Sequence, residues 1–179
     1  PEDEVLYPWP SFSEYIFATN LMGAKPVPVE LTPDFKYDFK KFHEQVTRKT
    51  KIVFICNPNN PTGTFANRED LQGFIDSLPA DILVVVDEAY EEYVTDPSFS
   101  SAVELLNSHE NVIVLRTFSK IYGLAGLRVG YGMASPEIIS LLNRVREPFN
   151  VNLLAQEAAV AALKDQEHVR QSKDLVIEG

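Results

Sequence analysis

An unbroken run of aliphatic residues at positions 82–86 (I-L-V-V-V) constrains the fold of this chain more than any other feature. A strand with no polar residue on either face is typical of a parallel sheet that helices cover on both sides. Residues 51–56 (K-I-V-F-I-C) and 112–115 (V-I-V-L) are expected to form two more buried strands, and segments of helical periodicity separate the three. Strands that alternate with helices predict an α/β fold, with a mainly parallel sheet and helices on both faces.

The remaining elements follow from the same periodicities. Further strands are expected at residues 27–31 and 127–133. Helices are expected at residues 12–22, ending at Gly23, at 38–48 with Asp38 as the N-cap, at 68–77, near 101–107, from Pro136 onward, and at 152–164. A chain of 179 residues is long enough to bury a sizeable core as one domain.

The net charge and the small numbers of cysteine and histidine argue against several classes of function. Sixteen Lys and Arg against twenty-six Asp and Glu give a net charge of −10, which argues against a nucleic-acid or anionic-membrane partner. No stretch approaches the roughly 20 apolar residues of a membrane span. The N-terminus (P-E-D-E) is too acidic for a signal peptide, so a cytoplasmic protein is expected. The single cysteine, Cys56, excludes an internal disulfide, and the three histidines are too far apart to predict a metal site.

Ligands of parallel α/β sheets bind beyond the carboxyl ends of the strands. Three loops leave predicted strand ends, at residues 57–63, 87–90 and 117–126. Lys120 lies in the last of these loops, among small and apolar residues. In a partly dry pocket the pKa of a lysine falls toward neutrality, and its amine can then attack a carbonyl and form a Schiff base. A surface lysine at a helix start is the alternative interpretation.

Two residues at the carboxyl end of the strand at 82–86 could bind a small planar ligand together with Lys120. Asp87 closes the strand at 82–86, so its carboxylate is expected in the crevice, and the phenol of Tyr90 follows three residues later. A turn or helix cap is the alternative role for Asp87. Cys56 precedes the first loop at a buried strand end and is expected in the core rather than as a nucleophile.

The other two loops offer rigidity and hydrogen-bond donors. Residues 57–63 (N-P-N-N-P-T-G) form a turn in which the prolines fix φ and Gly63 permits a strained conformation, and this turn can be purely structural. Two hydroxyls and a guanidinium flank Lys120, and these are the donors that a phosphate needs. They belong to Thr117, Ser119 and Arg128.

Three motifs in this order resemble the large domain of the fold-type I pyridoxal-phosphate aminotransferases, classes I and II. They are N-P-N-N-P-T-G at 57–63, D-E-A-Y at 87–90 and T-F-S-K-I-Y-G-L-A-G-L-R-V-G-Y-G at 117–132. P-S-F-S-E-Y at 10–15 and R-E-P-F-N-V-N-L-L-A-Q-E-A-A at 146–159 make the chain most similar to the histidinol-phosphate aminotransferases. The resemblance covers nearly the whole chain. It implies a three-layer fold and pyridoxal 5'-phosphate as the cofactor.

The resemblance also implies a role for each candidate residue. Lys120 forms the Schiff base with the cofactor aldehyde and later moves a proton between the substrate Cα and the cofactor. Asp87 holds the proton of the ring nitrogen, so that the ring remains an electron sink. Asn60 and Tyr90 hydrogen-bond the phenolic oxygen of the ring. Phe12 stacks on the ring, where many relatives have tyrosine, and an ordinary core phenylalanine is the alternative. The phosphate is expected to be held by Thr117, Ser119 and Arg128.

The function that the resemblance implies is the exchange of an amino group between histidinol phosphate and 2-oxoglutarate, a step of histidine biosynthesis. The expected partners are therefore a small amino donor, a 2-oxo acid acceptor and a second copy of the protein in a homodimer. Three alternatives remain open. They are an aromatic or broad-specificity aminotransferase or a related decarboxylase, a non-catalytic cofactor-binding regulatory domain, and an α/β domain whose motifs are only structural.

Compared with the family pattern, the chain is expected to be a fragment. Residues 1–150 correspond to part of the cofactor-binding large domain, beginning after its first strand and helix. Residues 151–179 are expected to form a helix that leads towards a missing small C-terminal domain. Alone, such a fragment is expected to bind the cofactor weakly, to show little or no transamination, and to associate through exposed apolar surface.

Overall fold

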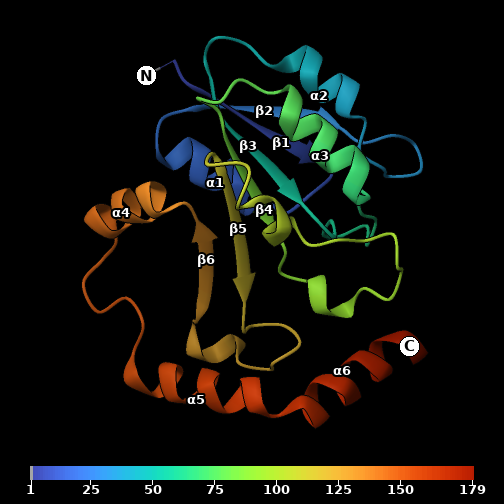
Figure 1. The fold of residues 1–179 in the computed structure, drawn as a ribbon, viewed down its shortest axis with the longest axis vertical. Helices are drawn as coiled ribbons and strands as arrows, with labels where there is room; N and C mark the ends of the chain where they lie inside the picture. The colour runs from blue at the N-terminus through green and yellow to red at the C-terminus, as the bar shows by residue number, and fades with distance from the viewer. Residues whose placement is uncertain (1) are drawn as a thin grey trace.

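The computed structural model describes residues 2–179, which form one six-stranded sheet with helices around it (Figure 1). The strands lie in the order β2-β1-β3-β4-β5-β6. All neighbours pair in parallel except β5 and β6, so the prediction of a mainly parallel sheet is confirmed. The strands are β1 (Glu4–Trp9), β2 (Lys25–Glu30), β3 (Thr50–Cys56), β4 (Leu83–Asp87), β5 (Val112–Thr117) and β6 (Gly130–Ala134).

Helices cover both faces of the sheet, as the sequence predicts. On one face, α2 and α3 bury Phe42 and Phe74 against the valines of the central strands. On the other face, α1 places Tyr15 against β1 and β3, and α4 packs Ile138 against β4 and β5. The sheet is therefore the middle of three layers. The helices are α1 (Glu14–Leu21), α2 (Phe39–Gln45), α3 (Arg68–Ser77), α4 (Pro136–Val145), α5 (Leu153–Lys164) and α6 (Gln166–Glu178).

The predicted N-cap of α2 is present, and α5 has a cap of the same kind. Asp38 precedes α2 and its side chain accepts a hydrogen bond from the backbone N–H of Lys41 at 3.1 Å. Asn152, where the sequence predicts the start of a helix, caps α5 in the same way through the N–H of Ala155 at 2.9 Å. Each cap satisfies one of the donors that the first helical turn leaves free.

The expected helix near 101–107 is only a short 3-10 turn, Ala102–Leu105. The carboxylate of Glu88 accepts the N–H of Ala102 at 2.6 Å, which fixes the start of the turn. The backbone bonds that follow run between residues three apart, from Glu104 to Ser101 and from Leu106 to Val103. The expectation of an α-helix was therefore wrong, because a distant carboxylate holds this segment in a tighter turn.

The strand expected at 127–133 begins later, at Gly130. Leu127 ends a 3-10 turn, Ala125–Leu127, and Arg128 has the left-handed conformation with φ +56°. A left-handed residue interrupts the extended backbone, so pairing with β5 starts only at Thr117 and Gly130.

The sequence analysis did not predict β1 or α6. β1 contains Pro8, which argues against an inner strand. Its pairing with β3 involves only Glu4, Val5 and Leu6, so Pro8 lies beyond the part of β1 that β3 borders. α6 has no buried residue that would give it an apolar stripe, and ion pairs of Arg170 with residues one turn away on the same helix stabilise it instead.

The helix expected at 152–164 is confirmed as α5, and a further helix, α6, follows it because Asp165 ends α5 and caps α6. Both run across the end of the molecule beyond β5 and β6 (Figure 1). α5 buries Ala155 and Ala159 against Phe118 and Val129 of the β5–β6 connection. Within residues 2–179 no helix combines the length and apolar character needed to cross a bilayer.

Candidate active site

The carboxyl ends of the parallel strands meet at one edge of the sheet, as the sequence predicts. Cys56 at the end of β3 pairs with Asp87 at the end of β4. The chain then turns, and the N–H of Asn57 donates to the carbonyl of Asp87 at 2.8 Å. These contacts bring the loops at 57–63 and 87–90 side by side.

A small hollow of about 40 Å³ lies between these loops and the one that carries Lys120. The structure therefore brings together five of the eight predicted site residues. A larger groove of about 420 Å³ adjoins the hollow, because Asn60 and Tyr90 line both. The hollow is lined by Phe12, Cys56, Asn60, Asp87, Ala89, Tyr90 and Lys120.

Asp87 is the carboxylate of this hollow. One of its oxygens, Oδ2, accepts the hydroxyl of Tyr15 at 2.8 Å, and the other accepts the N–H of Ala89 at 3.1 Å. Burial raises the pKa of Asp87 above its usual range, while these two hydrogen bonds and the charge of Lys120 act in the opposite direction. The alternative role as a turn cap is partly correct, because the bond to Ala89 closes the turn at 87–90.

Lys120 lies on the open side of the hollow. Its Nζ atom lies 5.1 Å from the centroid of the Tyr90 ring, within the range of a cation–π contact. The expectation of a partly dry surrounding was wrong, because the Lys120 side chain is exposed.

Phe12 lies between the core and solvent, with 39% of its surface exposed. Its ring packs against that of Tyr15 in a T-shaped arrangement, with centroids 5.7 Å apart and an interplanar angle of 86°. An exposed aromatic ring at the edge of the hollow leaves a face for a planar ligand.

Cys56 is buried as expected, and burial raises the pKa of its thiol, which makes it a poor nucleophile.

The loop at 57–63 contains three asparagines, of which two stabilise the loop and one lines the hollow. Asn57 accepts the N–H of Ala66 at 2.8 Å and is fully buried. Asn59, also buried, accepts the hydroxyl of Ser11 at 2.6 Å. Asn60 is the asparagine of this loop that lines the hollow. The structural interpretation therefore applies to Asn57 and Asn59, and a binding role is open to Asn60.

The three predicted phosphate donors do not line the hollow. Thr117 accepts the N–H of Ser119 at 3.1 Å through its hydroxyl, which orders the turn after β5. The guanidinium of Arg128 donates to the carbonyl of Ala125 at 2.7 Å and is exposed. All three lie in the connection between the end of β5 and the start of β6, next to Lys120 in the chain. Their role stays a prediction.

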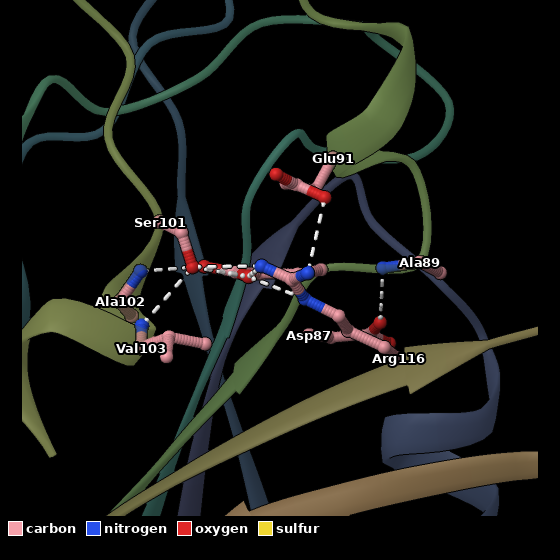
Figure 2. Close-up of polar contacts among 8 residues, drawn as sticks. Asp87, Ala89, Glu91, Ser101, Ala102, Val103 and Arg116 are labelled. Carbon is pink, nitrogen blue, oxygen red and sulfur yellow. Dashed lines mark hydrogen bonds and ion pairs between the residues drawn. The ribbon is translucent and has the colours of Figure 1, made fainter. Parts of the chain in front are cut away.

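A buried ion pair holds the 87–90 loop from the other side of β4 (Figure 2). Glu88 is fully buried, and its Oε2 accepts the Nε and Nη2 of Arg116 at 3.1 and 2.9 Å. Ser101 donates to the same oxygen at 2.8 Å, and Arg116 also contacts Glu91 at 3.4 Å. Burial raises the pKa of Glu88, and these donors oppose the rise. The pair joins β4, β5 and the 3-10 turn at 102–105.

The model of the family described as aminotransferase class I and II matches residues 1–178. The chain belongs to the class I and II aminotransferases. It is 54% identical over 180 residues to the histidinol-phosphate aminotransferase of Moorella thermoacetica, covering 100% of this chain and 46% of that protein. It is 46% identical to an aromatic amino acid aminotransferase of Streptomyces avermitilis, covering 94% of this chain and 47% of the relative.

A solved structure of another class I and II aminotransferase shows the same fold. The histidinol-phosphate aminotransferase of Sinorhizobium meliloti, in complex with pyridoxal-5'-phosphate, superposes with a TM-score of 0.88 at 30% identity and covers 96% of this chain and 47% of its own. The chain thus spans about half the length of the relatives it matches.

Aminotransferases of this family depend on pyridoxal phosphate. The groups around the hollow fit this cofactor chemically. A carboxylate can face a basic ring nitrogen, an amine can react with an aldehyde, and an aromatic face can stack on the ring. These groups belong to Asp87, Lys120 and Phe12.

The sequence analysis missed Tyr15 and Ala89 and treated Cys56 only as core. Tyr15 lies three residues after Phe12, a spacing that puts both on one side of a helical turn and could have revealed their contact. Ala89 contributes a backbone N–H, which every residue except proline has, so its residue type could not have revealed this role. Cys56 closes β3, and its pairing opposite Asp87 depends on the strand register.

Proposed function

We propose that this chain is the cofactor-binding part of a histidinol-phosphate aminotransferase, which exchanges an amino group between histidinol phosphate and 2-oxoglutarate. The observation that carries this proposal is the 54% identity to such an enzyme over the whole chain. The hollow supports it, because a carboxylate, an amine and an aromatic ring surround one small volume. The activity belongs to the whole protein that contains this chain.

Each residue of the hollow has a proposed role. When bound, pyridoxal phosphate supplies an aldehyde that takes up the amino group and a ring that withdraws electrons from the substrate Cα. Asp87 holds a proton on the ring nitrogen, and its two neutral hydrogen bonds keep the carboxylate oriented for this. Lys120 would hold the cofactor through its amine and would move a proton to and from the substrate Cα. Asn60 and Tyr90 would hold the phenolic oxygen of the ring by hydrogen bonds, and Phe12 would stack on the ring.

We propose that the phosphate is held at the connection between β5 and β6. Its position next to Lys120 in the chain supports this, because the aldehyde and the phosphate-bearing arm of pyridoxal phosphate are on adjacent carbons of the ring. Arg128 would have to release the carbonyl of Ala125 to reach a phosphate oxygen. The proposed donors are Thr117, Ser119 and Arg128.

A mass-spectrometric experiment tests the cofactor site. The chain is incubated with pyridoxal phosphate, reduced with borohydride, digested and searched for the modified lysine. A dominant adduct on Lys120 among the nine lysines is expected. Lys120→Ala should abolish this adduct, and Lys164→Ala, which removes another exposed lysine, should leave it unchanged. Labelling spread over many lysines in both the chain and the whole protein would contradict the proposal.

An aromatic aminotransferase is the second candidate, because relatives with that name are 46% identical to this chain. The whole protein separates the two when it is assayed with histidinol phosphate and with phenylalanine as amino donors, and 2-oxoglutarate as the acceptor. Turnover of histidinol phosphate with a much higher kcat/KM supports the first proposal. Turnover of phenylalanine alone supports the second.

We further propose that residues 1–150 form part of the large domain, that residues 151–179 lead to a second domain, and that the whole protein is a homodimer. Exposed apolar side chains on α4 and α5 support an association surface. They include Leu141, Leu142, Val145, Leu153 and Leu154. Light scattering of the whole protein is expected to give twice the mass of one copy, and a monomer at micromolar concentration would contradict the dimer.

The remaining partners follow from charge and redox state. The net charge of −10 supports small-molecule partners without a nucleic acid. We propose a cytoplasmic location for the whole protein, which the free, buried thiol of Cys56 supports. Fractionation of cells that produce the whole protein tests the location.

A further inference from the structure

Tyr15 connects two parts of the proposed cofactor site that lie far apart in the sequence. It belongs to α1 and is buried, with 4% of its surface exposed. Its ring stacks on Phe54 of β3 at 4.6 Å with an interplanar angle of 16°. The same ring forms a T-shaped pair with Phe12, with centroids 5.7 Å apart. Packing on both sides therefore fixes where the Tyr15 hydroxyl lies.

That hydroxyl donates to Oδ2 of Asp87 at 2.8 Å, across 72 residues of sequence. Burial and the charge of Asp87 raise the pKa of Tyr15 far above its usual range, so the phenol stays protonated and remains a donor. The hydrogen bond in turn lowers the pKa of Asp87, against the effect of burial. The other titratable groups that act on Asp87 or sense its charge are Lys120, Cys56 and Tyr37.

We propose that Tyr15 is a positioning residue of the cofactor site. Its hydroxyl fixes the orientation of the Asp87 carboxylate, and its ring supports Phe12 from behind. The buried side chain of Tyr15 then fixes the positions of the Asp87 carboxylate and of the Phe12 ring, the two groups that a planar ligand would contact. This inference rests on the proposed function for the identity of that ligand, pyridoxal phosphate.

The conservative variant Tyr15→Phe removes the hydroxyl and keeps the ring. Tyr7→Phe is the matched control, because Tyr7 is a buried tyrosine of the same cluster, with 3% of its surface exposed. Two properties are measured for each variant. The first is the pH at which the Asp87 carboxyl titrates in the cofactor-free chain, followed by carbon NMR. The second is the dissociation constant of pyridoxal phosphate, followed by the absorbance of the bound cofactor.

In Tyr15→Phe, Asp87 is expected to titrate at a higher pH than in the unchanged chain, because a hydrogen bond to its ionised form is gone. Cofactor binding is expected to weaken about tenfold, the effect of losing one hydrogen bond to a charged group. Tyr7→Phe is expected to change neither property. Circular dichroism confirms that both variants keep the fold.

A double-mutant cycle with Asp87→Asn separates positioning from general packing. If Tyr15 acts through Asp87, Tyr15→Phe adds little further weakening of cofactor binding in the Asp87→Asn background. Full additivity, or an unchanged titration of Asp87 in Tyr15→Phe, would overturn the inference. If the unchanged chain and the whole protein both fail to bind pyridoxal phosphate while Asp87 still titrates higher in Tyr15→Phe, the proposed function fails and the positioning of Asp87 stands.

Discussion

Replacing Arg116 with methionine tests whether the buried ion pair holds the loop that carries Asp87. The substitution keeps much of the side-chain volume and removes the guanidinium that donates twice to Glu88 and once to Ser101. Glu88 has no exposed surface, so its charge cannot turn to water. Removing one partner of a buried pair costs about 3–5 kcal/mol of unfolding free energy.

The lower end of that range, about 3 kcal/mol, is expected here, because Glu88 keeps hydrogen bonds from Ser101 and Ala102. The weaker contact of Arg116 with Glu91, at 3.4 Å and partly exposed, adds less than about 1 kcal/mol. Urea denaturation of the chain measures the loss. With a slope of about 2–3 kcal/mol per M, the midpoint is expected to fall by about 1–1.5 M.

The pH dependence gives a second check. Burial raises the pKa of Glu88 in the folded chain above its ordinary value of 4.5, so between the two values the folded state binds more protons than the unfolded state. The unfolding free energy therefore falls as pH rises through this window. Without Arg116 the folded pKa rises further and the window extends to higher pH. The destabilisation by Arg116→Met is thus expected to be smaller near about pH 5 than near about pH 8.

Two controls make this reasoning refutable. Lys36→Met breaks an ion pair with Asp34 in which both side chains are more than half exposed, and it is expected to leave the urea midpoint nearly unchanged. Adding Glu88→Gln to Arg116→Met removes the stranded charge and is expected to recover part of the loss. An equal loss at both pH values, with no recovery in the double variant, would show that an unpaired carboxylate is not the cause.

Three further substitutions probe the fold around the site. Phe42→Ala empties a fully buried position and is expected to lower the unfolding free energy by about 3–5 kcal/mol in urea, whereas the exposed Phe17→Ala should change it by less than about 0.5 kcal/mol; equal effects would contradict the assigned core. Asp38→Ala removes the cap of α2 and is expected to cost about 1 kcal/mol in thermal unfolding, restored by Asp38→Asn. Gly63→Ala, at φ +70°, is expected to destabilise by about 1–2 kcal/mol, while Gly73→Ala within α3 is expected to stabilise by up to about 1 kcal/mol; the opposite order would refute the assigned backbone conformations.

The elements that local pattern determines could be predicted from the sequence. The run at 82–86 formed a central strand, because β-branched residues without polar neighbours fit only a strand buried on both faces. α3 was predicted with its observed bounds, since the apolar positions of Arg68–Ser77 recur at helical spacing between clear boundaries. Asp87 and Lys120 were found because each follows a predicted strand at the edge where ligands bind.

Long-range contacts could not be predicted in this way. The 3-10 turn at 102–105 depends on Glu88, whose carboxylate comes from the loop that follows β4. The exposure of Lys120 depends on what surrounds a loop in three dimensions and has no signature in the neighbouring letters. The hydrogen bond of Tyr15 to Asp87 spans 72 residues, so no local window contains both partners.

The adjacent carboxylates Asp87 and Glu88 show how position decides the use of a charge. Successive residues at a strand end point to opposite sides of the sheet, so one faces the hollow and the other faces the interior network. Glu88 has a guanidinium within 2.9 Å, which balances its charge inside the protein. Among the described residues, the groups that hydrogen-bond the carboxylate of Asp87 are a phenol and a backbone N–H, both neutral. The protein thus orients the Asp87 carboxylate without fully neutralising its charge. A protonated ring nitrogen in the hollow would balance the charge of Asp87, as the guanidinium of Arg116 balances that of Glu88.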